Sequence, residues 1–92
     1  MPEDRIVLRE HLLLKIRVTP ETRPEISEAV KVFRGKVVDF NAESMIIEIT
    51  GEPAKLGAFV DYASTIGIIE MCRAGALAIG RGGLPLKGEK NE

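Results

Sequence analysis

Two apolar stripes with helical spacing constrain the fold of this chain more than any other feature, because each lies between segments that have the character of β-strands. Each stripe places four apolar residues at positions i, i+3, i+4 and i+7, which is one face of a helix. The stripes are Ile26, Ala29, Val30 and Phe33 in one segment and Leu56, Phe59, Val60 and Ala63 in the other. Each predicted helix therefore buries one side against a surface that the rest of the chain has to supply.

Both predicted helices have start and stop signals. Thr22 and Glu25 have the spacing of a capping box, Pro24 fits the first helical turn, and Gly35 ends the segment. The second helix is opened by residues 50–53, Thr-Gly-Glu-Pro, and is closed by residues 64–67, Ser-Thr-Ile-Gly.

Four segments outside the helices have the character of strands. Alternating apolar residues predict strands over residues 9–18 and 44–50, and β-branched and aromatic residues favour a strand over residues 36–41. The second and third strands form a hairpin with a short loop, and residues 68–73 give the fourth strand. The predicted order of elements is βαββαβ.

This order predicts an α+β, ferredoxin-like sandwich. Two split βαβ units with right-handed crossovers give a four-stranded antiparallel sheet of order 4-1-3-2, with both helices on one face. We expect the domain to cover residues 9–83, between an amino-terminal lead-in of residues 1–8 and a mobile tail of residues 84–92. Within the domain, residues 76–79 are suited to adding a short strand to an edge.

Length and charge exclude several classes of protein. The chain has 92 residues, 45% of them hydrophobic, which is enough apolar mass for one core. Its formal net charge of -1 provides no field for a polyanion. The single cysteine, Cys72, cannot form an intramolecular disulfide, residues 1–5 do not resemble a signal peptide, and charges interrupt every apolar stretch. We therefore expect a cytoplasmic protein without a nucleic-acid or membrane partner.

The face of the predicted sheet away from the helices has the pattern of a protein interface. It carries apolar residues on three strands, although an open sheet face normally favours polar side chains. It also carries two basic residues on the first strand, flanked by an acidic residue on each neighbouring strand, and such cross-strand pairs support the register. The plain alternative is a set of isolated exposed apolar side chains. The predicted interface residues are Leu13, Lys15, Arg17, Ile46, Glu48, Ile68 and Glu70.

Other residues of chemical interest predict no catalytic or metal site. His11 and Cys72 lie on neighbouring predicted strands, but a structural zinc site needs four ligands. The carboxylates Asp39, Glu48 and Glu70 have no evident pocket or partner for acid–base work, and the glycine-rich residues 75–83 are not followed by a helix that would bind phosphate. We expect no catalytic residue, no cofactor and no metal.

Several motifs, in order, resemble the carboxy-terminal domain of the acetolactate synthase small subunit. The most specific part is the run Phe33–Asp39, followed by Glu43-Ser44 and Thr50-Gly51 at this spacing. The resemblance spans roughly residues 8–82. It departs from the family at residues 74–75, Ala-Gly in place of Thr-Gly, and at residues 65–68, Thr-Ile-Gly-Ile in place of Pro-Phe-Gly-Ile. Further matches are Arg9-Glu10, Ile49, Gly67-Ile68, Arg73-Ala74-Gly75 and Arg81-Gly82.

The resemblance implies a noncatalytic, regulatory and dimerising module in branched-chain amino acid biosynthesis. By resemblance, its partners are a second copy of itself and the catalytic large subunit, which carries thiamine diphosphate, magnesium and FAD. The amino acid site of such a subunit is expected in a separate amino-terminal ACT domain, and this chain begins where the second domain should begin. We expect the chain to hold none of these cofactors.

A free-standing ACT-like module that binds a small amino acid is the main alternative. Such a module needs a glycine-rich first turn, whereas residues 19–23 read Thr-Pro-Glu-Thr-Arg and Pro20 removes a backbone N–H. A small enzyme such as an acylphosphatase would need a phosphate loop at the same place, where Glu21 is unfavourable. An RNA-binding version would need aromatic residues on the open sheet face, which carries Leu13, Ile46 and Ile68 instead.

Overall fold

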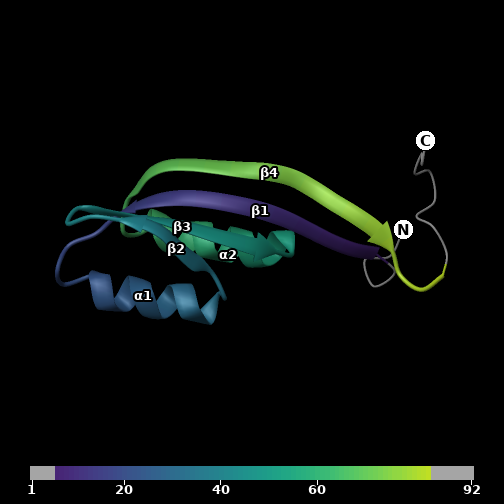
Figure 1. Cartoon of the computed structure of the whole chain (residues 1–92), viewed down its shortest axis with the longest axis horizontal. Coiled ribbons are helices and arrows are strands. Elements are labelled where there is room, and N and C mark those ends of the chain that lie inside the picture. The colour runs from purple at the N-terminus through teal and green to yellow at the C-terminus, as the bar shows by residue number, and fades with distance from the viewer. Residues whose placement is uncertain (1–5, 84–92) are drawn as a thin grey trace.

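The computed structural model describes residues 6–83, which form six elements in the order βαββαβ. They build one antiparallel sheet with the strand order β2-β3-β1-β4, and both helices lie on one side of it (Figure 1). The predicted ferredoxin-like α+β fold and its strand order are confirmed. The elements are β1 (Ile6–Arg17), α1 (Arg23–Val32), β2 (Lys36–Phe40), β3 (Ser44–Gly51), α2 (Pro53–Ser64) and β4 (Ile68–Gly80).

The hydrophobic core lies between the helices and alternate residues of the two central strands. Phe59 of α2 is fully buried, and its ring meets the ring of Phe33 edge-on at a centroid distance of 5.2 Å. Both predicted helical stripes face this core, with Ala29, Phe33 and Val60 partly buried at its margin. No polar or charged residue is buried in the described part of the chain. The buried residues are Leu12, Leu14, Ile16, Val18, Ile26, Val30, Met45, Ile47, Ile49, Leu56, Phe59 and Ala63.

The predicted capping box at the start of α1 is wrong. Thr22 is the N-cap residue, but its side chain makes no cap hydrogen bond. Its Oγ1 instead accepts a hydrogen bond from the backbone N–H of Thr19 at 2.9 Å. The turn before the helix therefore uses the hydroxyl, and Pro24, which has no N–H to satisfy, marks the first turn.

The fourth strand, β4, is longer than predicted. It continues past Arg73 to Gly80, because residues 77–80 pair with residues 6–9 of β1. Residues 76–79 therefore extend β4 and do not add a separate edge strand. On the other side of the pair, Ile6 to Leu8, expected in the lead-in, already belong to β1. The predicted tail over residues 84–92 lies outside the described residues.

Two bulges in β4 change which of its residues face the helices. From Arg9 to His11, β1 advances by two residues while β4 advances by three, from Leu77 to Ala74. The second bulge lies at Ile69, since neighbouring residues of β1 pair with residues 70 and 68. A bulge inserts one unpaired residue and breaks the strict alternation of sides along a strand.

Residues 6–9 and 77–80 form a two-stranded arm, called the β-arm below. β3 pairs only with residues 10–17 of β1, so the β-arm continues beyond the third strand. Figure 1 shows it running past the end of α2. Leu77 and Ile79 on the β-arm are 76% and 66% exposed.

No helix within residues 6–83 is long and apolar enough to cross a bilayer.

Tyr62, the single tyrosine of the chain, connects the two helices. Its hydroxyl on α2 donates a hydrogen bond to Glu25 Oε2 on α1 at 3.1 Å. Burial, followed by this hydrogen bond and the negative charge of Glu25, raises the pKa of Tyr62 to about 12. Because the pKa in the folded state exceeds the usual value of about 10, the interaction adds stability below about pH 10 that is lost as pH rises towards about 12.

We expect a spectrophotometric titration of the folded protein to show phenolate formation with a midpoint near pH 12. The chain has no tryptophan, so the absorbance change reports this one group. Glu25→Gln should lower the midpoint while leaving it above the usual value, because burial of the ring remains. An unchanged midpoint in Glu25→Gln would show that Glu25 does not act on the phenol.

Candidate functional site

The sheet face away from the helices, called the open face below, collects the alternate residues of each strand. Since Leu12, Leu14 and Ile16 are buried under the helices, the odd-numbered residues of β1 lie on the opposite side. Their cross-strand partners share that side. The open face thus holds His11, Leu13, Lys15 and Arg17 of β1, Ser44, Ile46, Glu48 and Thr50 of β3, and Glu70, Cys72 and Ala74 of β4.

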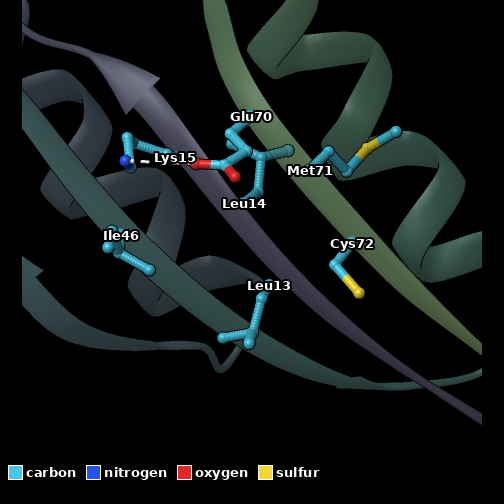
Figure 2. Close-up of a pocket in the computed structure, with 7 residues that line it drawn as sticks. All are labelled: Leu13, Leu14, Lys15, Ile46, Glu70, Met71 and Cys72. Carbon is cyan, nitrogen blue, oxygen red and sulfur yellow. Dashed lines mark ion pairs between the residues drawn. The ribbon is translucent and has the colours of Figure 1, made fainter.

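A shallow hollow of about 240 Å³ opens on this face. Figure 2 shows Leu13, Ile46 and Cys72, from three adjacent strands, around it. At one end lies the ion pair between Lys15 Nζ and Glu70 Oε1, at 3.2 Å. The hollow is smaller than the roughly 300 to 1,000 Å³ of a typical ligand pocket. An apolar centre with charges at its margin is the usual composition of a protein–protein contact.

Charged residues on the open face pair across strands, with one pairing that differs from the predicted arrangement. Lys15 faces and pairs with Glu70, one of the two acidic residues predicted to flank it. Glu48, however, accepts a hydrogen bond from His11 Nε2 at 2.7 Å, and not from Lys15 or Arg17. Exposed ion pairs contribute only about 0 to 1 kcal/mol to stability. Their main effects are therefore on register and on the choice of partner.

The prediction that Ile68 lies on the open face is wrong. Ile68 is opposite Ile16, whose side chain is fully buried, and it packs partly buried against the core. The cause is the extra residue at Ile69, which breaks the alternation that would have placed Ile68 and Glu70 on one side. Cys72, considered from the sequence only as a metal ligand, takes its place beside Leu13.

The candidate metal and acid–base residues do not converge on a centre. Residues 6–83 contain no group of three or more His, Cys, Asp or Glu side chains suited to holding a metal ion. Asp39 lies opposite Ile46 on the edge strand β2. Glu48 and Glu70 are each engaged in a separate pair. The carboxylates therefore do not share a pocket, which general acid–base catalysis requires.

Comparison with known proteins finds one family. A sequence profile described as "Small subunit of acetolactate synthase" matches residues 9–82. The acetolactate synthase small subunit of Mycolicibacterium smegmatis is 45% identical over 80 residues, which cover 87% of this chain and 47% of that protein. The probable acetolactate synthase small subunit of Archaeoglobus fulgidus is 42% identical over 76 residues, covering 83% and 48%.

The likeness extends to three-dimensional structure. The crystal structure of the acetolactate synthase small subunit from Thermotoga maritima matches with a TM-score of 0.81 at 37% identity, covering 88% of this chain and 50% of that one. The chain spans about half the length of these two curated relatives.

Proposed function

Because the chain belongs to the family of acetolactate synthase small subunits, we propose that it is a noncatalytic regulatory and dimerisation module of that enzyme. Its role in branched-chain amino acid biosynthesis is contact, both with a second copy of itself and with the catalytic large subunit. Thiamine diphosphate, magnesium and FAD belong to the large subunit in this proposal, and the module acts in the cytoplasm. The proposed contact residues are Leu13, Lys15, Arg17, Ile46, Glu48 and Glu70 on the open face. Ile68, which was predicted with them, is left out because it packs against the core.

The uncovered hollow on the open face is the observation that carries this proposal. Both helices pack on the other side of the sheet, so Leu13, Ile46 and Cys72 face solvent in the isolated chain. Leu13 alone is 41% exposed. Covering apolar surface contributes about 25 cal/mol for each Å² removed from water, which favours a protein partner at this place.

We expect the chain to associate with its cognate large subunit and to have no pyruvate-condensing activity by itself. Size-exclusion chromatography of the mixture, at tens of micromolar of each protein, should show co-elution. Acetolactate formation should follow the large subunit alone, because the described residues of this chain bring no set of catalytic groups together. Separate elution at that concentration would place the large-subunit contact in another part of the small subunit, and activity of the isolated chain would contradict the noncatalytic role.

A further inference from the structure

We propose that the outer edge of β4 pairs with the same edge of a second copy, so that two sheets join into one antiparallel sheet across a twofold axis. This inference rests on the proposed function, because it assigns the self-contact of the dimer to a strand edge. The open faces of both copies then lie side by side and stay uncovered. They form a platform for the large subunit.

The two edges of the sheet differ in how they are protected. The β2 edge is 5 residues long, carries Lys36 and Asp39, and has a bulge between Val37 and Asp39. Short length, charge and bulges are the features that keep an edge from pairing with other chains. β4 also contains two bulges, but it is 13 residues long and its residues 74–80 include no charged side chain. Within residues 6–83 no strand covers its outer side.

The β-arm lacks a third strand. Residues 6–9 and 77–80 pair only with each other, since β3 reaches only as far as Glu10. A two-stranded ribbon is only marginally stable in water, and Leu77 and Ile79 are largely exposed. Pairing along the free edge supplies the missing neighbour. It also satisfies the outward backbone N–H and C=O groups of β4 with partners from the second copy.

The bulge in β4 restricts the register of this pairing. Before the bulge, the even-numbered residues Glu70, Cys72 and Ala74 lie on the open face. After it, Leu77 and Ile79 do so, because they lie opposite the odd-numbered residues 9 and 7 of β1. When the segment before the bulge pairs with the partner's segment after it, continuous open faces therefore require an even-numbered residue of one copy opposite an odd-numbered residue of the other.

One register of this kind also brings opposite charges together. When Ala74 faces the partner's Leu77, Cys72 faces the partner's Ile79, and Glu70 comes beside the partner's Arg81, the first residue after β4. The twofold axis then passes between residues 75 and 76, and each contact occurs twice. Shifting the register by two residues places Glu70 opposite the partner's Ile79 or the partner's Gly83, and the charge pair is lost.

The native thiol of Cys72 provides a direct test. It is exposed and is the single cysteine of the chain. Residues 72 and 79 are about 23 Å apart along one strand, too far for a disulfide within one copy. In the proposed register they lie directly opposite across the axis. Ile79→Cys, treated with diamide, should therefore form disulfide-linked dimers. Ala78→Cys is the matched control, since it lies one residue away on the other face and should stay unlinked.

Two further measurements separate the edge pairing from dimerisation itself. Sedimentation of the unmodified protein gives the oligomeric state. The distance between spin labels on the two copies of native Cys72 should be centred on about 23 Å, because these residues are seven positions apart along the joined strands. A dimer in which Ile79→Cys does not cross-link, or in which the labels are much closer, overturns the edge pairing but not the proposed function. A monomer at high concentration overturns both.

Discussion

Phe59→Ala is expected to lower the free energy of unfolding by about 3 to 5 kcal/mol. Phe59 is fully buried, and its ring contacts Phe33 at 5.2 Å and Tyr62 at 6.0 Å between centroids. Its loss opens a cavity at the junction of the two helices and the sheet. A small domain has about 5 to 15 kcal/mol of stability in total, so a large part of the free energy of unfolding is lost.

Urea unfolding followed by circular dichroism measures this effect. Val32→Ala is the matched control, because Val32 lies on α1 with 71% of its surface exposed and its truncation should change the free energy by less than about 0.5 kcal/mol. A loss below about 1 kcal/mol in Phe59→Ala, with an unchanged slope of the unfolding free energy against urea concentration, would mean that the core closes around the missing ring.

Ile46→Lys is expected to weaken association with the large subunit by at least about tenfold, because it puts a charge at the centre of an apolar contact. The free protein should tolerate the change. Ile46 is on the open face, where a lysine side chain can reach solvent, and Asp39 lies directly opposite on β2. Thermal unfolding should therefore stay close to that of the parent protein. Self-association should persist too, since the edge of β4 is two strands away.

The comparison variant for Ile46→Lys is Val32→Lys, which makes the same change of charge on the helical side of the molecule. It should bind the large subunit like the parent chain. If Ile46→Lys binds equally well, the large subunit does not contact the open face. If it instead dissociates the dimer, the copies meet through that face and not through β4.

The sequence pattern predicted the architecture because few arrangements bury two helical stripes. Leu56, Phe59 and Ala63 can only meet a sheet face that is itself apolar, and the alternation of Leu12, Leu14 and Ile16 supplies one. The bulges were not predictable in the same way. A bulge at Ile69 depends on how β4 fits the twist of β1, which is a property of the assembled sheet.

The candidate site was predicted in part for a related reason. The shared face of Leu13, Lys15, Ile46 and Glu70 follows from alternation, and the structure places these residues around one hollow. The pairing of Glu48 does not follow from alternation. Glu48 faces Leu13 in the register, so His11 and Lys15 are its diagonal neighbours on β1. Lys15 pairs with Glu70 instead, and His11 pairs with Glu48.

The position of β1 in the sheet has a consequence for synthesis of the chain. β1 is translated before the other strands of this domain but lies between β3 and β4, so one of its two neighbours is the last to appear. Ribosomes add about 5 to 20 residues per second, and pairing between distant segments is slow. Until β4 is complete, a nascent domain can assemble only the β2-β3-β1 part of the sheet, with the hydrogen-bonding edge of β1 bare. Neighbouring nascent chains are therefore most prone to misassemble along β1. In the finished protein this strand is central, and β3 and β4 pair with both of its edges.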